Sequence, residues 1–358
     1  MRKVKWGVIG CGGIADRRTL PGMMLAKNAE LVAVMDVSKE AAERCKEKYG
    51  AKYAFTSVEE LLAVEEIEAV YIATPVVVHK EQATLAAKAG KHILLEKPLA
   101  LTSDVSQQIV DVCKENNVKL GVGLMMRFSA YHQEMRRIIQ SGEIGEIVSM
   151  RAQFTCWYPE MENCWRQKWA TSGGGALTDM GVHCIDLLQY ISGLSVCDVV
   201  AMTGNQIFKY EVEDSASVIM RMENGCCAYV DTAFNIPDDA AVCKLEFYGT
   251  AGSIFAEGTV SQEEVGTVKV TKTDPNKAYD ASQQRAGDVS STLVVDPGNM
   301  YTKEVEAFGD AILNDVEPPV KGVCAVFDQR IIEAAYESNN TKRVVSLEKK
   351  DVDYGFML

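Results

Sequence analysis

The chain has 358 residues, of which 47% are hydrophobic and 24% charged, which is enough for two folded domains and excludes a disordered chain. Its formal net charge of −13 argues against a nucleic-acid partner, because a phosphate backbone is bound by a basic face. No apolar run approaches the ~18 residues of a membrane span, no Cys or His spacing indicates a metal site, and the 11 cysteines fit reduced thiols, so we expect a cytoplasmic protein.

The first part of the chain alternates short apolar runs with amphipathic segments. Strands are expected at residues 4–9, 30–35, 69–73, 92–95 and 118–122. Helices are expected between them at residues 38–49, 58–63, 80–89 and 102–116, with N-caps at Ser38, Ser57 and Thr102. This alternation predicts right-handed βαβ units, so residues 1–122 should form a doubly wound parallel sheet of the α/β class.

After residue 123 the pattern changes to consecutive strands joined by tight turns. These strands are expected at residues 147–156, 199–208, 215–222, 226–233, 243–248, 252–257 and 267–273. The expected helices are at residues 130–141, 178–191, 301–314 and 323–339, the last two packing back near the first domain. Residues 123–358 should therefore form an α+β domain around an open, mainly antiparallel sheet, with a loop or lid at 274–291.

A G-x-G-x-x-A turn follows the first expected strand. Gly10 permits the tight turn, Gly12 lets a pyrophosphate approach the backbone, and Ala15 keeps the next helix close to the sheet. Asp36, at the end of the second strand, would accept hydrogen bonds from ribose hydroxyls and repel a 2′-phosphate. We therefore expect a Rossmann domain that prefers NAD to NADP, although Lys39 lies near enough to weaken the preference. The expected cofactor residues here are Gly10, Gly12, Gly13, Ile14, Ala15 and Asp36.

Two more segments follow expected parallel strands, at the edge where doubly wound sheets bind ligands. The first carries Thr74, Pro75 and His79, and the second is Glu96-Lys97-Pro98. A lysine at such a strand end can donate a hydrogen bond to a substrate hydroxyl and stabilise an alkoxide. A solvated surface lysine is the alternative for Lys97, since most lysines are exposed.

A third segment contains Asp179 and His183 after a run of three glycines. On an α-helix, residues i and i+4 share one face. A histidine beside a carboxylate is a common general base near neutral pH. A core histidine held by Asp179 for packing is the alternative.

These motifs occur in a fixed order, followed by Glu246-Phe-Tyr-Gly-Thr-Ala-Gly-Ser253. Between them lie Arg127-Phe128 and Trp165-Arg166. The ordered set resembles the Gfo/Idh/MocA family of sugar, inositol and related dehydrogenases over essentially the whole chain. The Glu-Lys-Pro and Asp-x-Gly-x-His motifs are its most specific members.

The resemblance implies a role for each matching residue. Lys97 would touch the nicotinamide ribose and the reacting hydroxyl, His183 would be the acid/base, and Asp179 would bind a neighbouring hydroxyl and orient His183. Thr74, Pro75 and His79 would line the cofactor pocket, with Glu96 beside it. The residues implied to face the substrate or the nicotinamide end are Arg127, Trp165 and Arg166.

Two aromatic residues and two loops are candidates for specificity. Trp157 and Tyr158 could stack on a sugar, or could be ordinary domain core. The loops 157–172 and 274–295 are expected to shape the substrate pocket, but neither has a readable code.

Three functions fit these motifs. The first is an NAD-dependent oxidoreductase acting on a secondary alcohol or ketone of a sugar, glycoside or cyclitol. The second is a glycoside-cleaving enzyme that uses NAD for transient oxidation and elimination. The third, a non-enzymatic NAD-binding regulator, is disfavoured by the intact Lys97, Asp179 and His183 set.

An open antiparallel sheet leaves one face without helices of its own chain, and that face must be covered. We therefore expect a homodimer or homotetramer formed through the second domain.

Overall fold

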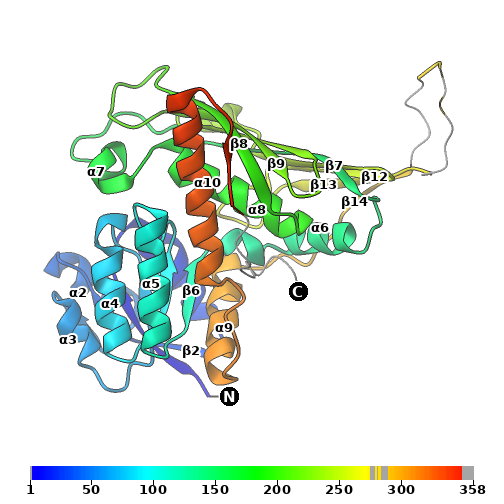
Figure 1. Ribbon diagram of the computed structural model, residues 1–358. Helices are drawn as coiled ribbons and strands as arrows, with labels where there is room; N and C mark the ends of the chain where they lie inside the picture. The colour runs from blue at the N-terminus through cyan, green and yellow to red at the C-terminus, as the bar shows by residue number, and fades with distance from the viewer. Residues whose placement is uncertain (1, 275–278, 280, 284–288, 349–358) are drawn as a thin grey trace.

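The computed structural model describes residues 2–274, 279, 281–283 and 289–348, which fold around two sheets (Figure 1). The first sheet is entirely parallel and has the strand order β3-β2-β1-β4-β5-β6. Its strands are β1 (Val4–Ile9), β2 (Ala29–Met35), β3 (Tyr53–Phe55), β4 (Ala69–Ile72), β5 (His92–Glu96) and β6 (Leu120–Gly123). The predicted doubly wound parallel sheet is thereby confirmed. The edge strand β3 was not predicted, because it has only three residues and all are half-buried.

The helices of the first sheet begin where their capping residues indicated. The side chains of Ser38, Ser57 and Thr102 each accept a backbone N–H in the first turn of the following helix. The four helices are α2 (Lys39–Tyr49), α3 (Val58–Leu62), α4 (His79–Lys88) and α5 (Ser103–Glu115). The helix after the glycine turn begins as a π-helix, η1 (Ala15–Thr19), and continues as α1 (Leu20–Leu25).

The second sheet has nine strands in the order β14-β13-β12-β11-β7-β10-β9-β8-β15. Its strands are β7 (Ile147–Thr155), β8 (Val196–Gly204), β9 (Ser215–Met222), β10 (Cys227–Ala233), β11 (Lys244–Gly249), β12 (Gly252–Glu257), β13 (Thr267–Lys272), β14 (Val289–Thr292) and β15 (Val345–Ser346). Among the described residues, neighbouring strands of this sheet pair antiparallel, except β7 with β10, which pair parallel. The mainly antiparallel open sheet is therefore confirmed.

Three details of the second sheet differ from the prediction. Strand β8 begins and ends several residues before the predicted 199–208, because the chain turns away after Gly204. Strand β14 lies at the end of the stretch predicted to be a loop, where it pairs with β13. Much of the rest of that stretch, 275–278, 280 and 284–288, lies outside the described residues. Strand β15 pairs with β8 over only two residues and has no sequence signal of its own.

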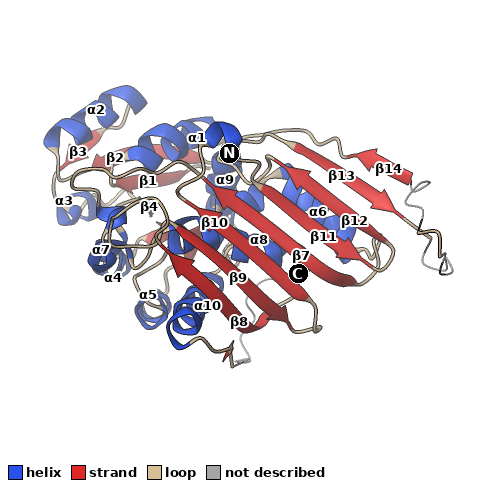
Figure 2. Cartoon of the chain, turned by 90° about the horizontal axis from the view of Figure 1, so that it is seen from above, coloured by secondary structure: helices blue, strands red, loops and turns tan. Residues whose placement is uncertain are grey.

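Helices cover one face of the second sheet and leave the other open (Figures 1 and 2). Helices α6 (Ala130–Gln140) and α8 (Val182–Ser192) pack on the covered face. On the opposite face, Tyr229 is paired in register with Ile219, and Ile219 with Val200, and all three side chains are exposed. This apolar row crosses the three neighbouring strands β10, β9 and β8.

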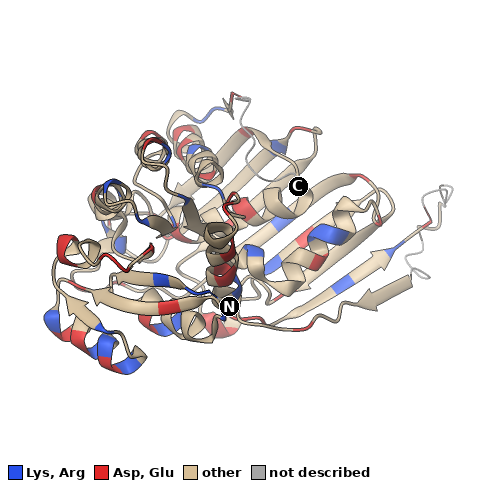
Figure 3. Cartoon of the chain, turned by 90° about the horizontal axis from the view of Figure 1, so that it is seen from below, with Lys and Arg blue, Asp and Glu red and all other residues tan. Residues whose placement is uncertain are grey.

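Acidic and basic positions are interspersed along the outer helices (Figure 3). Ion pairs one helical turn apart, such as Lys46 with Glu43 and Arg137 with Glu134, join some of them. Exposed pairs of this kind contribute only about 0.3–0.5 kcal/mol each, so the fold depends chiefly on its apolar cores.

The helix α9 (Met300–Leu313) returns from the second domain to pack on the first sheet. Phe308 lies 5.7 Å from the ring of Trp6, between ring centroids. A Cβ on Gly121 of β6 would lie 2.6 Å from the Phe308 ring, so a glycine is needed for this close approach. The glycine at position 121 of β6 is thus required by Phe308, which lies on a helix almost 200 residues later in the chain.

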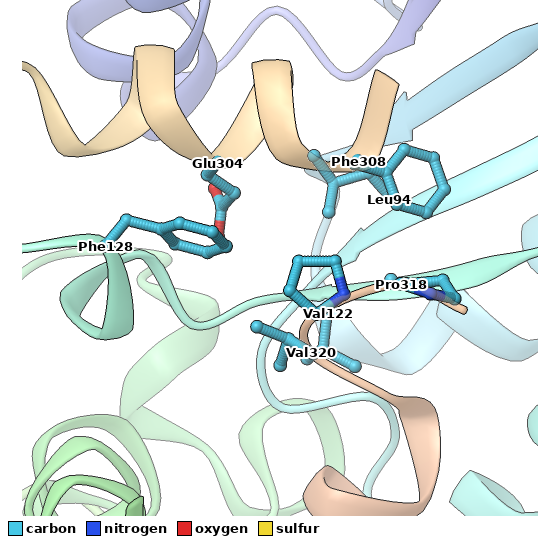
Figure 4. A pocket seen from close by; sticks show the side chains of 9 residues that line it. Leu94, Val122, Phe128, Glu304, Phe308, Pro318 and Val320 are labelled. Carbon is cyan, nitrogen blue, oxygen red and sulfur yellow. The ribbon is translucent and has the colours of Figure 1, made fainter. Parts of the chain in front are cut away.

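Glu304 lies on the buried face of α9. It is 1% exposed, and neither carboxylate oxygen has a hydrogen-bond partner within the described part of the chain. It faces a small cavity lined by Val122, Phe128 and Val320, among other residues (Figure 4). Burial, and secondly the nearby carboxyl of Glu96, raise the pKa of Glu304 well above its ordinary value. Burial therefore favours the protonated form of Glu304 in the folded protein.

This raised pKa makes the stability depend on pH. The folded state holds the Glu304 proton more tightly than the unfolded chain, so the resulting stabilisation is complete below the ordinary pKa of 4.5 and is lost as the pH rises from there towards the folded pKa. Glu304→Gln removes this dependence while keeping the shape of the protonated acid. We expect its melting temperature to exceed that of the wild type at pH 8, with the difference shrinking towards pH 5.

Glu317→Gln, which changes an exposed carboxylate near the same cavity, is the control. A difference between Glu304→Gln and the wild type that does not grow with pH would contradict the assignment of a protonated Glu304.

Candidate active site

The glycine turn after β1 forms an open cradle. Gly10 has φ +96°, and a Cβ there would lie 2.8 Å from the carbonyl oxygen of Ala73, so only glycine fits. A Cβ on Gly12 would meet nothing within 4 Å, which leaves space above the loop. The N–H of Asp16 donates to the carbonyl of Gly12 at 2.9 Å and starts the helix there. This arrangement fits a pyrophosphate at the helix N-terminus, with Gly13, Ile14 and Ala15 forming the turn.

Asp36 lies beside this cradle at the end of β2. Its carboxylate accepts hydrogen bonds from the backbone N–H groups of Cys11 and Ser38, each at 2.9 Å. These contacts fix the carboxylate next to the glycine turn. Each oxygen keeps a lone pair that could accept a ribose hydroxyl.

Arg17 is a candidate cofactor residue that the sequence analysis missed. Its Nη2 lies 2.9 Å from the position a Cβ on Gly13 would occupy, so the guanidinium extends over the glycine turn. A basic residue one turn into the helix after a G-x-G-x-x-A motif is the signal that could have indicated it.

His79 joins the two segments that follow β4 and β5. Its Nε2 lies 2.9 Å from the carbonyl oxygen of Thr74, and its Nδ1 lies 3.0 Å from that of Pro98. The ring is 1% exposed, and burial lowers the pKa of His79. His79 therefore holds the backbone around the cradle. The hydroxyl of Thr74 is engaged by Gln82 at 2.6 Å, and Pro75 begins the short turn η2 (Val76–Val78).

Lys97 forms an ion pair with Asp179 across the two domains. Its Nζ donates to Oδ1 and to the backbone carbonyl of Asp179, each at 2.8 Å. The two side chains are 14% and 31% exposed. Burial acts to raise the pKa of Asp179, but the charges of Lys97 and Arg166 outweigh it and hold this pKa below its ordinary value. Asp179 is therefore a carboxylate in this ion pair.

His183 lies next to this pair as a neutral imidazole. It is 5% exposed, and its Nδ1 is buried with no hydrogen-bond partner among the described residues. Burial, and secondly the charge of Lys97, lower the pKa of His183 well below its ordinary value. A neutral imidazole close to an ammonium group can accept a proton from a ligand.

The geometry between Asp179 and His183 differs from the prediction. Asp179 lies in a π-helical turn, η5 (Leu177–Gly181), and only His183 belongs to the α-helix α8. No hydrogen bond joins the two side chains within the described part of the chain. The expectation that Asp179 directly orients His183 is therefore not supported by this geometry, because the carboxylate is turned towards Lys97.

The side chain of Glu96 is buried in the first domain, next to the backbone of Lys97. Its Oε1 accepts a hydrogen bond from the hydroxyl of Tyr71 at 2.5 Å, and its Oε2 accepts one from the N–H of Lys97 at 3.3 Å. Burial raises the pKa of Glu96. Its contacts thus lie behind Lys97, within the first domain.

Arg127 has a different environment from the one expected for it. Its guanidinium is 3% exposed and forms a buried ion pair with Asp186 of α8, with Nε 3.0 Å from both carboxylate oxygens. It also lies over the ring of Tyr190, at 5.1 Å from the centroid. These contacts favour a role in holding α8, not in facing the substrate or the nicotinamide. Motif matching cannot reveal this, because Asp186 is 59 residues away in the chain.

Of the four aromatic and cationic residues expected near the substrate, three lie close to Asp179 or to one another. The Nε of Arg166 lies 4.0 Å from Oδ2 of Asp179, and its guanidinium lies 4.4 Å from the ring centroid of Trp165. Tyr158 is half-buried, interacts with the Arg166 side chain and packs on Phe234 at 5.0 Å. Trp157 is 42% exposed and lies edge-on to another loop residue.

The lowered pKa of His183 can be measured directly. We expect NMR titration of its ring C–H signals to give a pKa below the ordinary 6.5. Lys97→Met should raise this pKa, because it removes a positive charge beside the imidazole. Lys88→Met, on the exposed side of α4, is the control and should have no effect. A His183 pKa at or above 6.5, or one insensitive to Lys97→Met, would refute the described electrostatics.

Both parts of the chain match family models of known oxidoreductases. Residues 4–124 match the oxidoreductase family with an NAD-binding Rossmann fold, and residues 132–255 match the GFO/IDH/MocA C-terminal domain. A 1,5-anhydro-D-fructose reductase of Ensifer adhaerens is 30% identical over 96% of this chain and 98% of that protein. A D-xylose 1-dehydrogenase (NADP⁺) of Haloferax volcanii is 26% identical over 96% of this chain and 99% of that protein.

The fold also matches solved structures. A levoglucosan dehydrogenase in complex with NADH and levoglucosan superposes with a TM-score of 0.85 over 97% of this chain and all of that chain, at 24% identity. Among the described helices, none has the length and apolar character needed to cross a membrane. The two family matches and the full-length relatives together show that the chain belongs to the GFO/IDH/MocA family of oxidoreductases.

Proposed function

We propose that this chain is an NAD-dependent oxidoreductase that transfers a hydride between the nicotinamide and a secondary alcohol or ketone of a sugar, glycoside or cyclitol. The observation that supports it most is the Lys97–Asp179 ion pair beside the neutral imidazole of His183. These three groups come from both domains and meet at the carboxyl edge of the first sheet, where ligands of such sheets bind.

The residues of this site divide the proton chemistry between them. The nicotinamide, when bound, supplies the hydride acceptor or donor. Lys97 has three N–H donors, and two are directed at Asp179, so one remains for the reacting oxygen of the substrate. His183 accepts the hydroxyl proton as the carbonyl forms and returns it in the reverse direction. Asp179 holds Lys97 in place, and its remaining lone pairs can accept a neighbouring sugar hydroxyl.

The cofactor is assigned to the cradle at the end of β1. The glycine turn would hold the pyrophosphate, Arg17 would lie beside it, and Asp36 would accept the adenosine ribose hydroxyls. The segments carrying Thr74, Pro75, His79 and Glu96 would form the floor of the nicotinamide end. On this proposal residues 1–122 bind the cofactor, and residues 123–358 bind the substrate and form the oligomer.

The substrate class follows from the relatives and from the polar site. Arg166, Asp179, Lys97 and His183 offer several hydrogen-bonding groups within one site, which suits a polyhydroxylated ring. Tyr158 and Trp165 are assigned to the wall of the substrate pocket, and Trp157 to its outer rim.

For the assembly, we propose that the exposed row of Tyr229, Ile219 and Val200 pairs with a second copy of the chain to give a dimer or tetramer.

A substrate screen tests the reaction class. D-xylose, D-glucose, levoglucosan and myo-inositol are offered with NAD or NADP, and 1,5-anhydro-D-fructose with NADH or NADPH, while nicotinamide absorbance is followed. We expect turnover with at least one of them, and its loss in His183→Asn. Turnover that His183→Asn leaves intact would overturn the proposed roles.

The same screen separates the glycoside-cleaving alternative. That reaction exchanges the hydrogen on the carbon next to the oxidised centre with solvent and consumes no net NAD. Glycoside cleavage with such exchange and without net reduced cofactor would favour the alternative over a simple dehydrogenase.

The proposed preference for NAD depends on Asp36. Its carboxylate stands where a 2′-phosphate would lie, so we expect NAD to bind at least tenfold more tightly than NADP. Asp36→Ala should reduce this ratio because it removes both the ribose acceptor and the negative charge. Fluorescence titration with the reduced cofactors measures both affinities, and Asp198→Ala, on the second sheet, is the control. A wild type that prefers NADP, or a variant with an unchanged ratio, would contradict this proposal.

A further inference from the structure

The glycine run before Asp179 is pressed against the side chain of Tyr336 and the backbone of Glu213. A Cβ on Gly174 would lie 2.1 Å from the hydroxyl of Tyr336, and a Cβ on Gly175 would lie 1.9 Å from the backbone oxygen of Glu213. Any larger residue would push these groups apart. The run is therefore shaped by its contacts with Glu213 and Tyr336, in addition to the turn it makes.

Glu213 binds the backbone at the start of the π-helical turn η5. Glu213 is only 4% exposed. Its Oε1 accepts hydrogen bonds from the N–H groups of Gly175 at 3.0 Å and Leu177 at 2.9 Å. The hydroxyl of Tyr336 donates to the same oxygen at 2.9 Å. Three donors thus converge on one buried carboxylate oxygen.

This network reaches Asp179 through one hydrogen bond. The N–H of Asp179 donates to the carbonyl of Gly175 at 3.0 Å, and Glu213 holds the N–H of that same Gly175. The hydroxyl of Tyr336 also lies 3.0 Å from that of Thr178, the residue before Asp179. A shift in Glu213 or Tyr336 must therefore move the backbone that carries the Asp179 carboxylate.

The helix that carries Tyr336 also holds the first domain. In α10 (Gly322–Thr341), Glu333 accepts from the N–H and the hydroxyl of Ser103, each at 2.6 Å. Gln329 donates to the carbonyl of Leu101 at 3.3 Å. Leu101 lies four residues after Lys97, so one helix contacts both the segment that follows Lys97 and the segment that precedes Asp179.

We infer that Glu213 and Tyr336 are positioning residues that set the place of Asp179 relative to Lys97. This inference rests on the proposed function, in which the Lys97–Asp179 pair binds the reacting oxygen. Neither residue touches that oxygen. They act on the Asp179 carboxylate through their hydrogen bonds to Gly175 and Thr178. The helix α10 also contacts the domain that carries Lys97.

A double-mutant cycle tests this inference. Tyr336→Phe removes one donor to Glu213 and keeps the ring, so we expect kcat to fall by roughly tenfold, consistent with a lost hydrogen bond to a charged group. NAD affinity should stay unchanged. In an Asp179→Asn background the same substitution should cost less than twofold, because the group it positions is already altered. Tyr53→Phe, on the edge strand β3, is the control. The assay uses whichever sugar of the screen is turned over fastest.

Hydrogen exchange gives a second measurement that needs no substrate. Tyr336→Phe and Glu213→Gln should each speed amide exchange over residues 173–181, and Tyr53→Phe should not. If Tyr336→Phe leaves both kcat and this exchange unchanged, or if its effect is as large in Asp179→Asn as in the wild type, the positioning role is refuted. If Asp179→Asn itself turns over like the wild type, the role proposed for the Lys97–Asp179 pair fails instead.

Discussion

The ion pair between Lys97 and Asp179 is the interaction on which the site depends. It joins the end of a parallel strand in the first domain to a π-helical turn in the second, with Nζ 2.8 Å from Oδ1. An ion pair removed from bulk water is costly to break from one side, because the remaining charge is left without its partner. The pair therefore constrains the two domains to one relative placement at the point where a ligand would react. Burial is the larger cause of the lowered pKa of His183, and the charge of Lys97 lowers this pKa further.

The rest of the fold serves to keep the two partners in reach of each other. Helices α9 and α10 leave the second sheet and pack on the first domain, where Phe308 lies against Gly121 and Glu333 caps α5 at Ser103. The chain thus crosses between the domains more than once. A single linker would allow hinge motion, whereas these returning helices restrict it. Buried polar groups such as Arg127 and Asp186 add directional contacts within this packed region.

Signals that act over a few residues were sufficient to predict much of this structure. The caps at Ser38 and Thr102 are local hydrogen bonds, and the glycine turn requires a positive φ at Gly10, so both can be read from neighbouring residues. The fold class followed from the alternation of strands and helices. The set of Lys97, Asp179 and His183 came from ordered motifs, and the structure brings the first two into contact.

The remaining features depend on residues far apart in the chain. The partner of Arg127 is on another helix, so its motif suggested a ligand where the structure has a buried ion pair. Asp179 lies in a π-helical turn, and no residue pattern indicates such a turn. Glu213 and Tyr336 carry no motif and meet only when the segment before β9 and the helix α10 are assembled around the glycine run. Strands β3 and β15 are too short to produce a periodic pattern.

Replacement of Lys97 tests the central claim most directly. In Lys97→Ala, the protein should still fold and bind the cofactor, while its melting temperature should fall because the Asp179 carboxylate loses its partner. Turnover of the best sugar substrate should fall at least about a hundredfold, the low end for a positioned proton-transfer group. Lys88→Ala, an exposed lysine of α4, should turn over normally. Near-normal turnover by a correctly folded Lys97→Ala enzyme would contradict the account.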